Sequence, residues 1–559
     1  MKKFLTIMLA LIMVLSVATG MAVAETEREQ ITITMFSMPA NTSGTLENTW
    51  WTNYLKEQLG ITIELLPSGD NDDTKMQSLL AADALPDIVV FEGTTYLKNA
   101  IDAGMLVCLD DYADSMPNAQ KYVKESMQYY ADNVSGDGKC YCISNNIGAR
   151  LDTDRLNYTV SLRYDLYQQV GSPEIKTTWD YLDVLKQMQD LYPENEEGQK
   201  VYAICAFSDW DGYAVSPAMY YSMLDGVDTG EKNINNMPFT QVDFKTGEVS
   251  TTLSPDSKYV EALKWYYTAN QMGILDPDSM TNTYSTYKEK VAAGRTLFAW
   301  WLWSVGGYNT PEHVNADEPT GFSIVLPTES TITLQGDDPI GSGWCWAISN
   351  KSEHIDRCIE YLDFMCDPDN IFVLANGRQG ECWDINEDGQ PYLTEKGIKL
   401  RSGEIEETDE GGTIGAGLGT INSYPIMNGT VSEKYGATIN CGGWATYTQE
   451  VSKLEQTRID ATGYTNAIDQ KIENGSYVNI PLACSLTAPL TDDMQILASQ
   501  IGDVVRTQSW LAIYAESDEE FDAIINEMCE TAEGLGLSEL MEYNKTVWEN
   551  ALELAAKYE

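Results

Sequence analysis

The apolar positions near the start of the chain follow two periodicities, one typical of β-strands and one typical of α-helices. Residues 31–36 and 61–66 alternate between apolar and polar side chains, which predicts two strands. Residues 48–59 and 75–82 carry apolar side chains at helical spacing, and 85–91 is a third, largely apolar strand. This strand–helix–strand order predicts an α/β fold built on doubly wound, mostly parallel sheets.

Ligands of such sheets bind at the carboxyl ends of the strands. Here those ends are Ser37–Met38 and Glu92–Gly93, and Glu92 brings a carboxylate to this edge. Glu92 is therefore a candidate ligand-binding residue.

An aromatic stretch at 294–308 stands out from its surroundings. It follows a helical pattern over 287–293 and holds Phe298, Trp300, Trp301 and Trp303 within six residues. Read as a central strand, it places Trp301 and Trp303 on one face and the other two rings on the opposite face. Indole rings suit stacking against a sugar ring, but they also fill cores, so both interpretations are open here.

The last third of the chain changes character. Residues 400–445 are rich in Gly, Thr and Asn and predict long loops, which suggests an insertion. Four helices are then predicted, over 447–460, 492–515, 519–533 and 537–557.

The charge balance and the histidine content exclude several classes of partner and of chemistry. With 559 residues the chain predicts two domains or lobes, and its 35 basic against 85 acidic side chains give a net charge of −50. Nucleic acid and anionic lipid both need a basic surface, so neither is an expected partner. Two histidines leave almost no material for histidine-based zinc or triad chemistry.

The N-terminus resembles a secretion signal. Lys2 and Lys3 precede an apolar run over 4–17, and Ala22-Val23-Ala24 is a small-residue cleavage site. We expect cleavage there and a secreted, extracellular or periplasmic protein; the alternative is an uncleaved anchor, because 4–24 carries no charge. No cysteine lies near the site, so a lipid anchor is not expected, and the eleven cysteines, being sparse and odd in number, are expected to be mostly buried thiols.

One segment matches the spacing of a calcium loop. Asp384, Asn386, Asp388 and Glu395 occupy positions 1, 3, 5 and 12 of that pattern, with Gly389 at position 6. Pro391 and poor flanking helices favour a β-hairpin instead. Ca²⁺ is thus a candidate cofactor and the hairpin its alternative; no other cofactor is expected.

Several motifs, in order, resemble the extracellular solute-binding proteins of carbohydrate ABC importers, in their large branch. They include Ala-Ala-Asp-Ala-Leu-Pro-Asp-Ile-Val at 81–89, Asp-Gly-Lys-Cys-Tyr-Cys-Ile at 137–143, and Gly-Ser-Gly-Trp-Cys-Trp-Ala-Ile-Ser at 341–349. Asn-Gly-Arg-Gln-Gly at 376–380 is similar to a turn of the large branch. Cys142 and Ser144 stand where the family usually has Gly and Pro.

The resemblance implies a two-lobed, periplasmic-binding-protein-like fold with a helix-rich C-terminal part. After a signal peptide (1–24), we expect lobe 1 to begin over 25–155 and lobe 2 over 156–297. A hinge strand and return to lobe 1 follow over 298–345, and 346–559 completes lobe 2 with the loop insertion and the C-terminal helices. The implied partners are an oligosaccharide and the permease subunits of an ABC transporter, and the protein is expected to be a monomer.

The candidate ligand-binding residues are aromatic rings with polar neighbours, the mixture that a sugar cleft needs. Besides Glu92, they are Trp210, Asp211, Tyr213, Trp301, Trp303, Trp344, Arg378, Trp383 and Trp444. No nucleophile elbow, phosphate-binding loop or dinucleotide fingerprint occurs, so we predict a binding protein and not an enzyme. The rival hypotheses are a secreted carbohydrate-active enzyme and a binding protein for a peptide or an acidic sugar, the last favoured if Arg378 binds the ligand.

Overall fold

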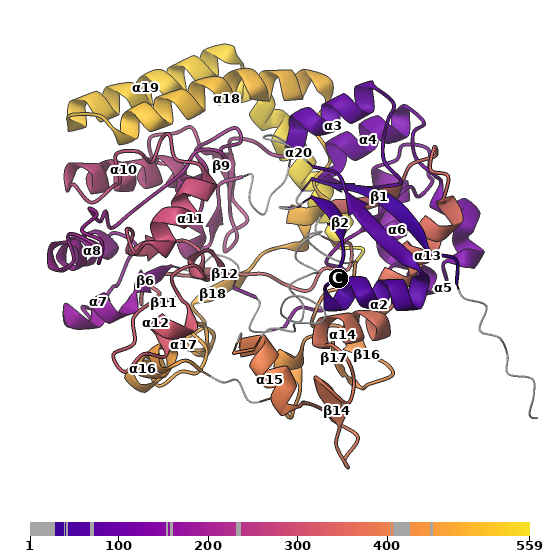
Figure 1. Cartoon of the computed structure of the whole chain (residues 1–559). Coiled ribbons are helices and arrows are strands. Elements are labelled where there is room, and N and C mark those ends of the chain that lie inside the picture. The colour runs from indigo at the N-terminus through magenta and orange to yellow at the C-terminus, as the bar shows by residue number, and fades with distance from the viewer. Residues whose placement is uncertain are drawn as a thin grey trace, which may run out of the picture.

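The computed structural model describes residues 28–38, 40, 43–67, 72–151, 155–156, 160–230, 236–341, 343–402, 404–405, 425–447 and 451–558. The predicted secretion signal therefore lies outside the described residues, as do residues 403 and 406–424 of the predicted loop region. Figure 1 shows two bodies side by side. We call the body around the N-terminal sheet lobe 1. The body around α8 (Asp180–Leu191), α10 (Lys258–Gln271) and α11 (Tyr284–Ala292) is lobe 2.

Lobe 1 is built on a six-stranded sheet. Its order is β2 (Gly44–Leu46), β3 (Ile61–Leu65), β1 (Ile31–Ser37), β4 (Ile88–Glu92), β13 (Trp344–Ile348) and β5 (Ile143–Ser144). β1 runs parallel to β3 and β4, as the strand–helix repeats predict, whereas β13 is antiparallel to β4 and β5. The carboxyl ends of β1 and β4 therefore meet at one edge of the sheet.

Two hydrophobic clusters cover the two faces of this sheet. One packs α2 (Trp50–Leu59), α5 (Pro117–Tyr122), α13 (Ile355–Met365) and α14 (Pro368–Asn376) against it. The other packs α3 (Asp72–Ala81), α4 (Thr94–Asp102), α6 (Lys124–Asn133) and part of α20 (Leu537–Ala555). Because α13 and α14 lie in lobe 1, residues 346–376 do not belong to lobe 2, where the sequence analysis placed them: β13 pairs with β4, and the chain then continues under the same sheet.

The start of α2 shows how local sequence sets an element. Thr49 and Thr52 form a reciprocal capping box, and Gly60 ends the helix in the left-handed region at φ 65°. Trp50 and Trp51 are then buried, and the indole N–H of Trp50 donates to Val373 O of α14. The predicted helix over 48–59 is confirmed with a later first residue.

Lobe 2 has a mixed core of short strands and helices. β6 (Ser161–Arg163) pairs antiparallel with β10 (Phe298–Ala299) and β11 (Phe322–Ile324). Residues 201–206 form no named strand, but they are tied to their neighbours by backbone hydrogen bonds from Leu297 N–H to Ala203 O and from Ile204 N–H to Ile274 O. The surrounding helices are α7 (Tyr164–Gln169), α8 (Asp180–Leu191), α10 (Lys258–Gln271), α11 (Tyr284–Ala292), α18 (Asp492–Ile513) and α19 (Asp518–Leu535).

The aromatic stretch departs from the predicted continuous strand. β10 ends at Ala299, and η4 (Leu302–Val305), a 3-10 turn, begins directly after Trp301. The expected pairings still occur: Trp301 and Trp303 stack with centroids 5.2 Å apart, and Phe298 meets Trp300 edge-on at 5.0 Å.

Some elements belong to both lobes. The first half of α20 packs Leu537 and Leu540 into the lobe 2 core, whereas its second half packs Val547 and Trp548 into lobe 1. β12 (Ile332–Leu334) and β18 (Tyr477–Asn479) pair in parallel where the chain passes between the lobes. The hairpin of β8 (Thr240–Asp243) and β9 (Val249–Thr251), flanked by β7 (Val227–Asp228), also joins both cores.

The remaining elements are short. The helices are α9 (Ser216–Met219), α12 (Pro311–Val314), α15 (Glu395–Ser402), α16 (Lys453–Thr462), α17 (Asp469–Glu473), η1 (Leu109–Ser115), η3 (Tyr221–Leu224), η6 (Cys441–Gly443) and η7 (Leu482–Leu486). The strands are β14 (Trp383–Ile385), β15 (Pro391–Leu393), β16 (Val431–Ser432) and β17 (Ala437–Thr438).

Among the described residues no helix has the length and apolar character needed to cross a membrane. All eleven cysteines are free thiols, and only Cys108 and Cys529 are not buried.

Candidate functional site

A cavity of about 550 Å³ opens at the carboxyl end of β4. Glu92 and Trp344 lie on its wall and are direct partners across the β4–β13 ladder. Thr94 and Thr95 at the start of α4 complete this side, and the opposite side comes from 485–489 and the end of α20. We call this hollow the lobe 1 cavity; it lies at the sheet edge predicted from the strand order.

The start of α4 leaves hydrogen-bonding capacity at the cavity. Its N-cap is Gly93, at φ 76°, which supplies no side chain to the first N–H groups of the helix. The buried hydroxyl oxygen of Thr94 also has no hydrogen-bond partner among the described residues. A buried polar atom without a partner costs free energy.

Lobe 2 carries an exposed aromatic surface. Trp303 is 56% exposed and Trp210 38% exposed, and their ring centroids lie 6.3 Å apart with planes 27° apart. Tyr284 stacks on Trp210 at 4.3 Å, and the buried Trp301 supports both tryptophans from below, at 5.7 and 5.2 Å. We call Trp210, Tyr284 and Trp303 the lobe 2 platform. In Figure 1, α11, which begins at Tyr284, lies between α8 and lobe 1.

The loop at 207–213 is fixed by its carboxylates. Asp209 accepts the backbone N–H of Tyr284 with both oxygens, at 2.8 and 2.9 Å. Asp211 accepts from Ser216 N–H at 2.7 Å and from the indole N–H of Trp510 at 2.8 Å. These bonds orient the platform, and burial raises the pKa of Tyr284 to about 12, so its hydroxyl stays protonated.

Tyr213 takes part in packing. Its ring lies 6.0 Å from Phe239, and its backbone presses on α18 at Gly502, where an added Cβ would stand 3.2 Å from Tyr213 Cα. Asp211 and Tyr213 therefore tie the loop to α18, beneath the exposed rings.

Three further candidates lie apart from both places. Trp383 is fully buried and Trp444 is 4% exposed, both within an aromatic cluster that includes Phe372. Their indole N–H groups donate to backbone oxygens at 2.8 Å each. Arg378 lies over the ring of Trp50 at 5.0 Å and within 3.6 Å of the carboxylates of Glu57 and Glu381. The two indoles pack inside lobe 1 and have no open face for a ligand ring, whereas the Arg378 side chain is 40% exposed.

The candidate calcium loop forms the alternative β-hairpin, β14–β15. Asn386 Oδ1 accepts from Asp388 N–H and Gln390 N–H inside the turn, and Gly389 provides the positive φ of 79°. Glu395 instead starts α15 and pairs with Lys399 at 2.7 Å. Within the described ranges no group of three or more His, Cys, Asp or Glu side chains could hold a metal ion. The side chains of Asp384, Asn386, Asp388 and Glu395 therefore do not fit a calcium site at this position.

A buried carboxylate fixes the backbone of one segment that connects the two lobes. Asp338 Oδ1 accepts from Ile340 N–H and Gly341 N–H at 2.9 and 2.8 Å, and burial raises the pKa of Asp338. Gly341 has φ 95°, and an added Cβ would stand 2.5 Å from Asn145 O on the other connecting segment. Two connecting segments are thus packed backbone to backbone next to the lobe 1 cavity.

Comparison with known proteins gives one family. The sequence profile described as bacterial extracellular solute-binding protein matches residues 40–371, more than half of the chain. One curated relative, an uncharacterized protein in the butB 5′ region of Niallia circulans, is 25% identical over 123 residues, or 22% of this chain. The match spans about half (47%) of that relative's length.

Solved structures give the same fold. The substrate-binding protein FusA of S. pneumoniae in complex with kestose superposes with a TM-score of 0.61, at 15% identity, over 94% of this chain and all of that one. A human milk oligosaccharide-binding protein of Bifidobacterium longum infantis gives a TM-score of 0.56 at 16% identity, over 93% and 99% of the two chains. The alginate-binding protein AlgQ2, solved without calcium, gives 0.60 at 14% identity, over 94% and 100%. These likenesses confirm the predicted two-lobed α/β fold class.

Proposed function

Because the chain belongs to the bacterial extracellular solute-binding proteins, we propose that it captures an oligosaccharide between its lobes and delivers it to an ABC importer. The ligand lies against the lobe 2 platform and reaches the lobe 1 cavity with its hydroxyl groups. Contacts with both lobes favour the closed form, so ligand binding shifts the protein toward closure.

The observation that carries this proposal is the pair of open indoles, Trp210 and Trp303. Exposing two large apolar rings costs free energy, and both are held in place by a buried layer beneath them. A pyranose ring offers an apolar C–H face to such a surface and hydroxyl groups to its rim. Fold neighbours solved with kestose and with Man1GlcNAc, and one described as binding human milk oligosaccharides, support the ligand class.

The three rival functions have less support than binding of a neutral oligosaccharide. Arg378, on which the acidic-sugar alternative depended, lies within 3.6 Å of two carboxylates and over an indole ring, away from the platform and the cavity. Lys288 at the platform and Lys557 at the cavity are the cations that an acidic sugar would meet, so the titration includes an acidic oligosaccharide. A peptide ligand has no specific feature in its favour. Enzymatic hydrolysis lacks support in the family, whose members are described as binding proteins.

The test is isothermal titration of the protein against a panel of neutral oligosaccharides and one acidic oligosaccharide, with tryptophan fluorescence recorded in parallel. We expect at least one saturating ligand with a change in emission. Labelled ligand recovered intact after prolonged incubation separates binding from hydrolysis. Lack of binding to every sugar in the panel would count against the proposal.

Localisation and assembly belong to the same proposal. We propose cleavage after Ala24, release of a monomer outside the cytoplasm, and docking of the closed form on the permease subunits. N-terminal sequencing of the exported protein and light scattering of the purified chain test the first two points. Binding of the ligand-loaded form to permease-containing vesicles tests the third.

A further inference from the structure

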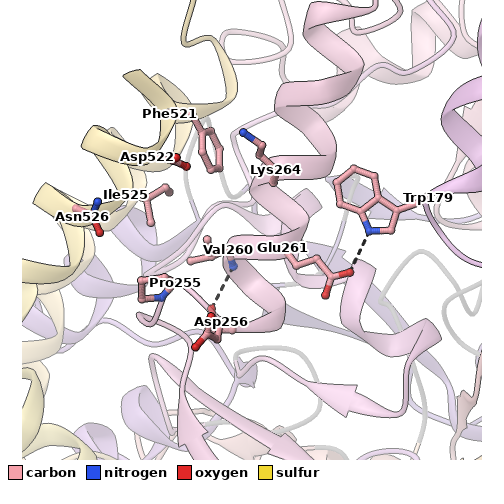
Figure 2. Close-up of a pocket in the computed structure, with 11 residues that line it drawn as sticks. Trp179, Pro255, Asp256, Val260, Glu261, Lys264, Phe521, Asp522, Ile525 and Asn526 are labelled. Atoms are coloured by element: carbon pink, nitrogen blue, oxygen red, sulfur yellow. Dashed lines mark hydrogen bonds between the residues drawn. The ribbon is translucent and has the colours of Figure 1, made fainter. Parts of the chain in front are cut away.

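A second hollow lies on lobe 2 between α10 and α19. It is an open groove of about 570 Å³, which we call the outer groove (Figure 2). It shares no residue with the lobe 1 cavity or the lobe 2 platform. The sequence analysis gave none of its residues a ligand-binding role.

Trp179 forms one side of the outer groove and is both open and rigid. Its side chain is 37% exposed, yet its indole N–H donates to Glu261 Oε1 at 3.1 Å. Glu261 also accepts from Tyr221 O–H at 2.9 Å and from Lys258 at 2.8 Å. Burial opposes ionisation of Glu261, but these hydrogen bonds outweigh it and hold the pKa of this carboxyl below its usual value.

The chain on either side of Trp179 is also fixed. Thr178 O accepts the indole N–H of the buried Trp265 at 2.9 Å. Asp180 accepts from the backbone N–H groups of Lys176 and Thr177 at 2.9 and 2.8 Å. The ring is therefore held in position without being packed into the core, which lowers the side-chain entropy that the protein would lose when a ligand stacks against it.

The rest of the groove combines an apolar floor with a polar rim. Phe521 and Ile525 of α19, each 3% exposed, line it from the side opposite Trp179 (Figure 2). Asp256, Asp522 and Asn526 bring oxygen and amide groups to the rim. Within the described part of the chain, the side chains of these three make no hydrogen bond or ion pair, so they can serve a ligand.

Charge restricts the kind of ligand. The basic side chain on the groove wall is Lys264, which pairs with Asp518 at 2.6 Å and lies over the ring of Phe521. Carboxylates therefore prevail on the wall, and a uronate, sulfate or phosphate would be repelled. Hydroxyl groups are donors that suit carboxylate acceptors.

We propose that the outer groove is a second carbohydrate-binding site, which holds one pyranose unit of a neutral polysaccharide stacked on Trp179. It goes beyond the proposed receptor function, because it acts on a longer chain and outside the space between the lobes. Such a site keeps the protein at a glycan surface while the platform and the cavity remain available for the transported sugar.

Native affinity electrophoresis of the whole protein tests this. The gels contain one soluble polysaccharide each: laminarin, mannan or xylan as neutral probes, and alginate as the acidic control. We expect retardation by at least one neutral probe and none by alginate. In the Trp303→Ala background, where cleft binding is weakened, we expect retardation to persist and to disappear when Trp179→Ala is added.

Two variants separate binding from folding. Trp179→Phe keeps an aromatic face and should retain most of the retardation, whereas Trp179→Ala raises the dissociation constant about tenfold or more. Asn526→Ala is an exposed change that leaves the core intact and should weaken binding in the same direction. The proposal is overturned if alginate retards the protein or if no neutral probe does. It is also overturned if retardation is unchanged in Trp179→Ala, or if it is lost in Trp303→Ala alone. Titration of oligosaccharides into Trp179→Ala, in which the outer groove is disabled, reports on the cleft, so failure of the outer site leaves the receptor function standing.

Discussion

Trp344 and Glu92 are direct partners across the antiparallel β13–β4 ladder, so an indole and a carboxylate reach the same cavity from neighbouring strands. The pairing joins residues that are 252 positions apart in the sequence. β13 returns to the sheet only after the chain has passed through lobe 2, so the cavity is completed by a late segment of the fold. Ligand contacts at this place therefore depend on correct assembly of both lobes.

The first prediction concerns the lobe 2 platform. Trp303→Ala removes the most open indole of the platform and should weaken oligosaccharide binding about tenfold or more, as measured by titration calorimetry. Leu302→Ala is a matched control, because it removes a 39% exposed apolar side chain from the same 3-10 turn. Equal losses in the two variants would contradict a role for the ring.

The second prediction concerns a buried ion pair in lobe 2. Lys290 Nζ lies 2.6 Å from Asp276 and 3.0 Å from Asn282 Oδ1, with both charged side chains at least 92% buried. Lys290→Met leaves the Asp276 carboxylate without its cation and should lower the free energy of unfolding by about 3–5 kcal/mol in urea denaturation. Replacing both partners, as Lys290→Met with Asp276→Leu, should recover part of the loss; a double variant less stable than the single one would contradict this reading.

The third prediction concerns Lys471, whose ammonium group donates to Ser330 O at 2.7 Å and to Thr328 O at 3.2 Å. Burial lowers the pKa of Lys471 to about 8. Between pH 8 and the pKa of the unfolded chain, the unfolded state holds more protons than the folded state, so this group makes stability rise with pH. Below pH 8 Lys471 is protonated in both states, so the full free-energy cost of burying its charge remains.

Comparison with Lys471→Met isolates this effect. Between pH 8 and 10, the wild type should gain about 2 kcal/mol in free energy of unfolding relative to the variant. Guanidinium denaturation at both pH values measures the difference, because the shared titration of other groups cancels. A difference independent of pH would show that Lys471 has an ordinary pKa.

The fourth prediction concerns metal. Because Asn386 and Glu395 are already bonded within the hairpin and to Lys399, chelation should leave the melting temperature unchanged, and Asp388→Asn should behave as the wild type does. Differential scanning calorimetry with EDTA and with added calcium provides the measurement. A calcium-dependent rise in Tm that vanishes in Asp388→Asn would restore the calcium loop.

Periodicity predicted the framework well, and the reason is physical. The alternation at 31–36 and the helical spacing at 537–557 each reflect one buried face, so β1 and α20 follow from local sequence. Burial of individual rings did not follow. Trp303 and Trp383 have the same chemistry, and only tertiary contacts make one 56% exposed and the other fully buried.

The calcium loop and the outer groove both show that local sequence does not determine a binding site. Oxygen ligands at the right spacing bind metal only if the backbone folds around it, and the β14–β15 ladder directs Asp384 and Glu395 into separate bonds. Conversely, nothing near Trp179 in the sequence marks it as open, because the opposite wall of its groove comes from residues 521–526. Sites made by distant segments have no local signature.

The position of α20 has a consequence for how the chain matures. This helix follows every other described element, yet it supplies Leu540 to one core and Trp548 to the other. While the polypeptide is still being synthesised, both halves lack part of their apolar side chains and stay only partly packed. The two lobes therefore complete the packing of their cores together, when α20 is added, and not one after the other.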